Sequence, residues 1–71
     1  MALVRKLEEQ KLEKDSPHKE VECTYSIVDG RYLQIDTYGS NERQIPGKKS
    51  QSIRFAPEAI AQLKTLLQEH F

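Results

Sequence analysis

The side chains with the clearest chemical potential are aromatic and basic residues in the second half of the chain. They are Tyr32, Tyr38, Arg43, Lys48, Lys49 and Arg54. Tyrosine rings stack on unpaired bases, and lysine and arginine neutralise phosphates, so the combination indicates binding of single-stranded nucleic acid. Tyrosines are also common strand residues that cover their cross-strand neighbours. On the pattern alone, this structural role is the favoured interpretation.

Residues suited to catalysis or metal binding are few and far apart. The chain has His18, His70 and a single cysteine, Cys23. No nucleophile, base and orienting group come together in the sequence, and one cysteine with two distant histidines matches no zinc spacing. The basic loop around Gly47 lacks the glycine and Ser/Thr spacing of a phosphate-binding P-loop. We therefore expect a protein that is not an enzyme and that uses no cofactor and no metal.

Composition limits the fold to one small domain and disfavours a strongly basic nucleic-acid binder. The 71 residues carry eleven Lys+Arg and eleven Asp+Glu, so the formal net charge is zero, and any affinity for a polyanion must come from local clustering. A core of this size is marginal without support, and a partner subunit is the expected supplement. With one cysteine, no apolar run of about 20 residues and no secretory signal, we expect a cytoplasmic protein.

Alternating apolar and polar residues predict strands over 21–28, 32–38 and 50–55, with a hairpin turn at Asp29-Gly30 between the first two. Pro57 and Glu58 then begin a helix that runs to the end of the chain. Its apolar stripe is formed by Ile60, Leu63, Leu67 and Phe71. The sequence thus predicts an α+β fold, a twisted antiparallel sheet of three to four strands followed by a C-terminal amphipathic helix.

The helix is expected to cover the apolar face of this sheet and so to form most of the core. That face is made of Cys23, Tyr25, Ile27, Leu33, Ile35, Ile53 and Phe55. Residues 1–19 form a charged arm that we expect to be a marginal helix or disordered, because Pro17 ends any helix and the apolar spacing before it is irregular. The folded domain is expected to span residues 20–71.

The order of these parts resembles the single-stranded-DNA-binding domain of the positive cofactor four family of transcriptional coactivators. The similar segments are residues 24–30 and 33–38 in the hairpin, Pro46-Gly47-Lys48-Lys49 in the loop, Ile53-Arg54-Phe55 in the third strand, and Pro57-Glu58 with Gln62-Leu63-Lys64 in the helix. The resemblance covers about two-thirds of the chain and leaves the arm unexplained. Two departures stand out: Asp36 lies where the family has a basic residue, and residues 39–44 lack a tryptophan that stacks on bases there.

The resemblance implies a homodimer whose helices pack between subunits, through Ile60, Leu63, Leu67 and Phe71, and whose sheets bind single-stranded DNA, or RNA as the alternative ligand. It implies nucleic-acid contacts for Lys48 and Lys49, then for Arg54 and Tyr38, in transcription regulation or in protecting unpaired strands. Such a protein would be nucleoid-associated in a bacterium and nuclear in a eukaryote. The competing hypothesis is a small protein-interaction module, docking through its outer sheet face or the arm, without nucleic acid.

Overall fold

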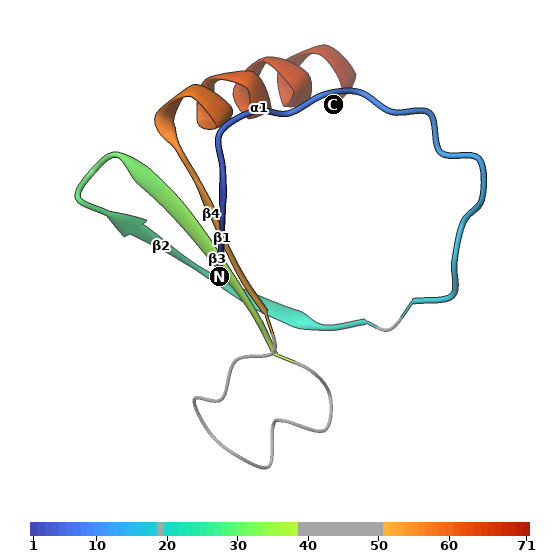
Figure 1. The fold of residues 1–71 in the computed structure, drawn as a ribbon, viewed down its shortest axis with the longest axis horizontal. Helices are drawn as coiled ribbons and strands as arrows, with labels where there is room; N and C mark the ends of the chain where they lie inside the picture. Colours follow the sequence, from blue (N-terminus) through green and yellow to red (C-terminus); the bar gives the residue numbers. More distant parts are fainter. Residues whose placement is uncertain (19, 39–50) are drawn as a thin grey trace.

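The computed structural model describes residues 1–18, 20–38 and 51–71. It contains one four-stranded sheet and one helix, in the order β1 (Ala2–Val4), β2 (Glu22–Val28), β3 (Tyr32–Tyr38), β4 (Gln51–Phe55) and α1 (Pro57–His70) (Figure 1). The α+β class and the C-terminal helix are as the sequence predicts. Among the described residues, no helix is long and apolar enough to cross a membrane.

The sheet has the strand order β1-β4-β3-β2, and its centre is antiparallel. Strands β2 and β3 form the predicted hairpin, with Tyr25 opposite Ile35. Asp29 and Gly30 both adopt positive φ, 55° and 65°, and the Arg31 N–H closes the turn on the Val28 carbonyl at 3.0 Å. Aspartate and glycine are residues that tolerate this left-handed geometry, which is why the dipeptide marks the turn in sequence.

The first residues form a strand, so the expected marginal helix is wrong for Ala2–Val4. Strand β1 lies parallel to β4, with Leu3 opposite Arg54, and this makes the sheet mixed. The Ala56 N–H continues the ladder by donating to the Val4 carbonyl at 2.9 Å. Without β1, the backbone groups on this side of β4 would be left unpaired within the sheet, and pairing them outweighs a weak local preference for helix.

The chain after β1 is held against α1 by one glutamine. The Leu7 N–H donates to Gln62 Oε1 at 2.9 Å, and Gln62 Nε2 donates back to the Leu7 carbonyl at 3.2 Å. Residues 5–18 form neither helix nor strand and follow a wide arc from α1 to the start of β2 (Figure 1). An exposed ion pair between Lys6 and Glu8, at 2.6 Å, adds little stability because both partners are solvated.

Helix α1 covers the apolar sheet face less completely than the sequence predicts. Only Ala56 separates β4 from α1, so the helix starts at one end of the sheet, and its main contacts are with β3 and β4. Ala59 in α1 and the preceding Ala56 are buried, whereas Tyr25 and Ile27 on β2 are 75% and 63% exposed. The expected burial of these two side chains, and of the exposed Cys23, is therefore wrong.

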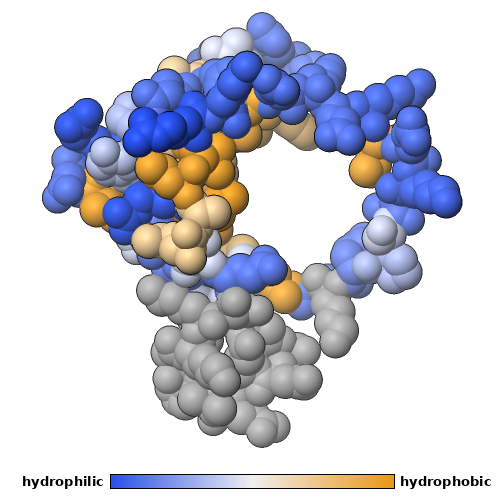
Figure 2. Space-filling model, in the orientation of Figure 1, coloured by the Kyte–Doolittle hydropathy of each residue, from blue (hydrophilic) through white to orange (hydrophobic). Residues whose placement is uncertain are grey.

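Much apolar surface consequently remains open. The last turns of α1 expose Leu66, Leu67 and Phe71, the last at 95%. An open hollow of about 770 Å³ lies at the other end of the sheet, lined by Met1, Ala2, Ile35, Thr37, Gln51, Ser52 and Ile53. Figure 2 shows apolar atoms bordering a wide opening between the sheet, α1 and the arc of residues 10–18.

Candidate nucleic-acid interface

The candidate site lies on the polar face of β3 and β4. Successive side chains of a strand point to opposite faces, so the even-numbered residues of β3 share this face. They are Tyr32, Gln34, Asp36 and Tyr38. The register adds Arg54 opposite Gln34 and Ser52 opposite Asp36. Sheet pairing thus places the sequence-predicted Tyr32, Tyr38 and Arg54 on one surface.

A chain of hydrogen bonds crosses this face. Arg54 donates to Gln34 Oε1 twice, from Nε at 3.1 Å and from Nη2 at 2.5 Å. Gln34 Nε2 donates to Asp36 Oδ1 at 3.1 Å, and the Ser52 hydroxyl donates to the same oxygen at 2.6 Å. The amide of Gln34 therefore connects a guanidinium to a carboxylate and holds Arg54 in a defined orientation.

Asp36 is the least exposed polar residue of the site, at 3%. The alternation predicts it as an outward acidic residue on the polar face, and it does lie on that face, but its neighbours cover it. Its hydrogen bonds with Gln34 and Ser52 offset part of the cost of burying a carboxylate. The negative charge that departs from the expected basic pattern is thus withdrawn from the surface.

Tyr32 stands beside two guanidinium groups. The Cζ atoms of Arg31 and Arg54 each lie 5.9 Å from the centre of its ring, within the range of a cation–π interaction. Arg54 also keeps its Nη1 group without a hydrogen-bond partner among residues 1–18, 20–38 and 51–71. A half-buried aromatic ring with two adjacent cations is an arrangement that can hold a base by stacking and its phosphate by charge.

Sequence reasoning missed two members of this cluster. Arg31 lies in the turn, where no alternation assigns a side chain to a face, so the sequence offers no signal for it. Gln34 lies on the predicted polar face, and only its pairing with β4 shows that it orients Arg54.

Tyr38 lies at the other end of β3 and is separate from this cluster. Six strand residues span about 20 Å, so Tyr32 and Tyr38 mark the two ends of the face. The Tyr38 hydroxyl shares a hydrogen bond of 3.3 Å with Thr24 on β2. The face therefore offers two aromatic positions at a spacing that suits several nucleotides of an extended strand.

The remaining predicted contacts, Arg43, Lys48 and Lys49, fall outside the described residues. Their assignment to nucleic acid stays a prediction. Among the residues that the structure does describe, no group of three or more His, Cys, Asp or Glu side chains is placed to hold a metal ion.

Comparisons of the chain with protein-family models, with curated proteins and with solved structures found no match. The resemblance to the positive cofactor four family therefore stays a prediction that depends on the residues quoted for it. What defines the candidate site is its geometry: a polar sheet face with an arginine–tyrosine cluster at one end and a second tyrosine at the other.

Proposed function

We propose that the protein binds single-stranded or locally unpaired DNA, without catalysis, through the polar face of β3 and β4. The observation that carries the proposal is the cluster of Tyr32 with Arg31 and Arg54, each guanidinium 5.9 Å from the ring. Stacking on tyrosine is tolerant of base identity, and the arginines supply phosphate contacts. Lys48 and Lys49, which lie outside the described residues, are the further phosphate contacts that the resemblance implies, and the role it implies is transcription regulation or strand protection.

Orientation of Arg54 strengthens this interpretation. Its side chain is fixed by Gln34 before any ligand arrives, so less side-chain entropy is lost on binding than for a free surface arginine. The buried Asp36 anchors Gln34 from the other side at 3.1 Å. The face therefore combines a preorganised cation with an aromatic ring. An ordinary solvent-exposed surface has freely rotating arginines instead.

Fluorescence anisotropy with a labelled oligothymidine tests the proposal. We expect saturable binding whose logarithmic dependence on salt has a slope of about −0.7 per phosphate contacted. Arg54→Gln should make the slope less steep by about 0.7 and weaken binding, and Arg54→Lys, which keeps the charge, should keep the slope while losing the fixed geometry. Lys11→Gln on the exposed arm removes the same charge and serves as the matched control. Flat anisotropy at high micromolar protein would refute the proposal.

A homodimer is part of this proposal and has its own support. Among the described residues, the fully buried apolar side chains are two alanines, Ala56 and Ala59. A chain with so little core gains most of its apolar burial by association, and the exposed Leu67 and Phe71 of α1 suit the helix contact that the resemblance implies.

The second candidate function is a protein-interaction module, and the exposed apolar face of β2 favours it. Tyr25 and Ile27 are large side chains of the kind that anchor protein partners. Under this alternative, replacing Lys48 and Lys49 with glutamate leaves function intact, whereas deleting residues 1–14 abolishes capture of the partner. Under the leading proposal, the same glutamate substitutions weaken oligothymidine binding.

A further inference from the structure

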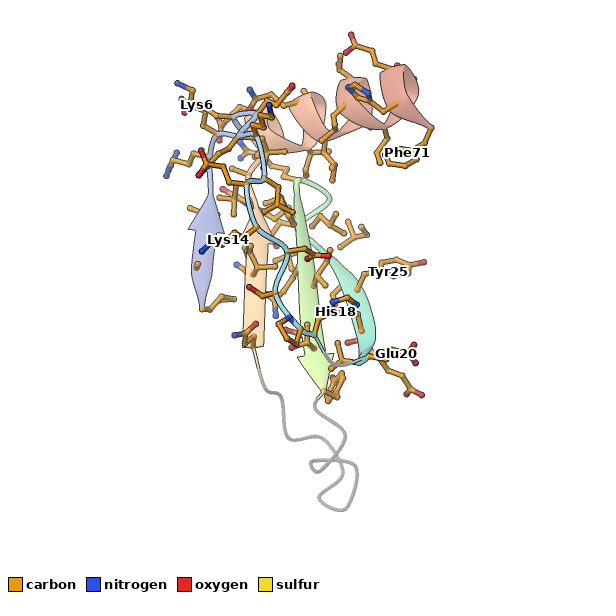
Figure 3. The ribbon with its side chains drawn as sticks, turned by 90° about the vertical axis from the view of Figure 1, so that its right-hand side faces the viewer. Lys6, Lys14, His18, Glu20, Tyr25 and Phe71 are labelled. Carbon is orange, nitrogen blue, oxygen red and sulfur yellow. The ribbon has the colours of Figure 1, made fainter. Side chains whose placement is uncertain are left out.

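Strand β2 is a free edge of the sheet. It is the last strand in the order β1-β4-β3-β2, and six of its seven residues are exposed. One row of its backbone N–H and C=O groups therefore has no strand beside it within the described chain, and such a row can pair with another strand. In Figure 3, β2 forms the outer border of the sheet, and Tyr25 extends beyond it.

This edge lacks most of the features that usually prevent pairing, and Glu22 is its one charged residue. The segment Glu22–Val28 contains no proline and no lysine, and it pairs with β3 one residue to one, without a bulge, along its whole length. Edge strands that must stay single normally carry such features. A seven-residue strand of alternating apolar and polar side chains, open to solvent, is instead suited to a β-strand partner.

We infer that β2 pairs antiparallel with β2 of a second copy, with Tyr25 opposite Tyr25 on the two-fold axis. Tyr25 is the middle residue of Glu22–Val28, so this register pairs all seven residues. It sets Cys23 opposite Ile27, Thr24 opposite Ser26 and Glu22 opposite Val28, with no like charges in contact. Aromatic pairs and Thr–Ser pairs of this kind stabilise antiparallel strands.

Exposed apolar side chains on β2 support a second copy as the occupant. Tyr25 and Ile27 are 75% and 63% exposed, and alternation places both on the apolar face of the edge strand. The register sets Tyr25 beside Tyr25 and Ile27 beside Cys23 of the other copy. Pairing would therefore bury apolar surface that α1 leaves open.

Pairing in this register would keep the two faces of the sheet distinct. Side chains directly opposite each other across antiparallel strands lie on the same face, so the polar faces of both copies join into one surface. The inference specifies how the two copies of the proposed homodimer meet, and it does not depend on whether that surface binds DNA.

Engineered cysteines test the register in the full-length chain. The variant Cys23→Ser/Tyr25→Cys places its only thiol on the axis, where directly opposed residues have Cα atoms about 4.5–5.5 Å apart, within the Cα separation that a disulfide spans. We expect oxidised glutathione to convert it largely to a covalent dimer on a non-reducing gel. The variant Cys23→Ser/Ile27→Cys is the matched control, because its two thiols would lie about 13 Å apart along the strands. Ile27→Cys with Cys23 retained should cross-link again, since those positions face each other.

Sedimentation equilibrium gives an independent reading. We expect the wild-type chain to have about twice its monomer mass of 8.2 kDa, and Thr24→Lys/Ser26→Lys to shift it to the monomer, because each lysine would oppose another. Gln10→Lys/Leu12→Lys adds the same number of lysines on the exposed arm and should leave the dimer intact. A monomeric wild type, or equal cross-linking of the two single-thiol variants, would overturn the inference. If the protein binds oligothymidine but the Tyr25→Cys variant does not cross-link, the β2 pairing is overturned and the DNA proposal stands. If the variant cross-links but the protein does not bind DNA, the β2 pairing stands and the DNA proposal is overturned.

Discussion

The Gln62 contact with the Leu7 backbone predicts how firmly the first residues are attached to the fold. Replacing Gln62 with alanine removes two hydrogen bonds, of 2.9 Å and 3.2 Å. A hydrogen bond contributes about 0.5–1.5 kcal/mol net, and because both of these are exposed to water we expect about 1–2 kcal/mol in total. Local opening of residues 2–7 should then become about 5–30-fold more frequent.

Hydrogen exchange followed by NMR measures this opening at individual amides. The Leu7 N–H should exchange faster in Gln62→Ala, and so should the Ala56 N–H, which donates to the Val4 carbonyl at 2.9 Å. Gln68→Ala is the matched control, since it makes the same helix-propensity change on an exposed position of α1. If both variants protect Leu7 as the wild type does, the contact does not hold the segment and our reasoning is wrong.

Three further substitutions follow from single positions, each measured by urea denaturation. Asp36→Ala should lower the free energy of unfolding by about 1–3 kcal/mol, because the donors of Gln34 and Ser52 lose their acceptor; an unchanged midpoint would contradict the hydrogen-bond chain. Gly30→Ala should cost about 1 kcal/mol from its φ of 65° alone, since the added Cβ meets no atom within 4 Å; a loss several times larger would reveal a clash. Phe71→Ala should change the free energy of unfolding of a monomer by less than about 0.5 kcal/mol, because the ring is 95% exposed. A larger loss of stability that grows with protein concentration would indicate that Phe71 packs against a second copy.

The hairpin and the helix could be predicted from sequence because their signals are local. Asp29-Gly30 defines the turn, alternation defines β2 and β3, and Pro57 starts α1. Strand β1 could not be predicted in this way. Three residues carry no usable periodicity, and Ala2–Val4 become a strand only because β4, about fifty residues later, offers an open edge.

The candidate site, like the fold, could be predicted from sequence only where the signal is local. Alternation places Tyr32 and Arg54 on one face, but their proximity depends on the register that sets Arg54 opposite Gln34. Burial of Asp36 also escapes a pattern-based prediction, because alternation gives the face of a residue and not the depth of its side chain. The exposure of Tyr25 has a similar cause, since amphipathicity shows that α1 has an apolar stripe without showing how much of the sheet it reaches.

Exposure of the apolar face at β2 follows from the shortness of the link between β4 and α1. With only Ala56 between them, the helix starts at the end of the sheet and cannot lie along the full length of β2. The apolar face at β2 is therefore left for association, and α1 lies on the side of the sheet opposite the arginine–tyrosine cluster. Because side chains alternate strictly along a strand, pairing through the β2 edge adds a second copy without covering the arginine–tyrosine cluster. The proposed self-association and the proposed DNA binding are thus compatible on one sheet, and a longer continuous polar surface predicts tighter binding to oligonucleotides that span both copies.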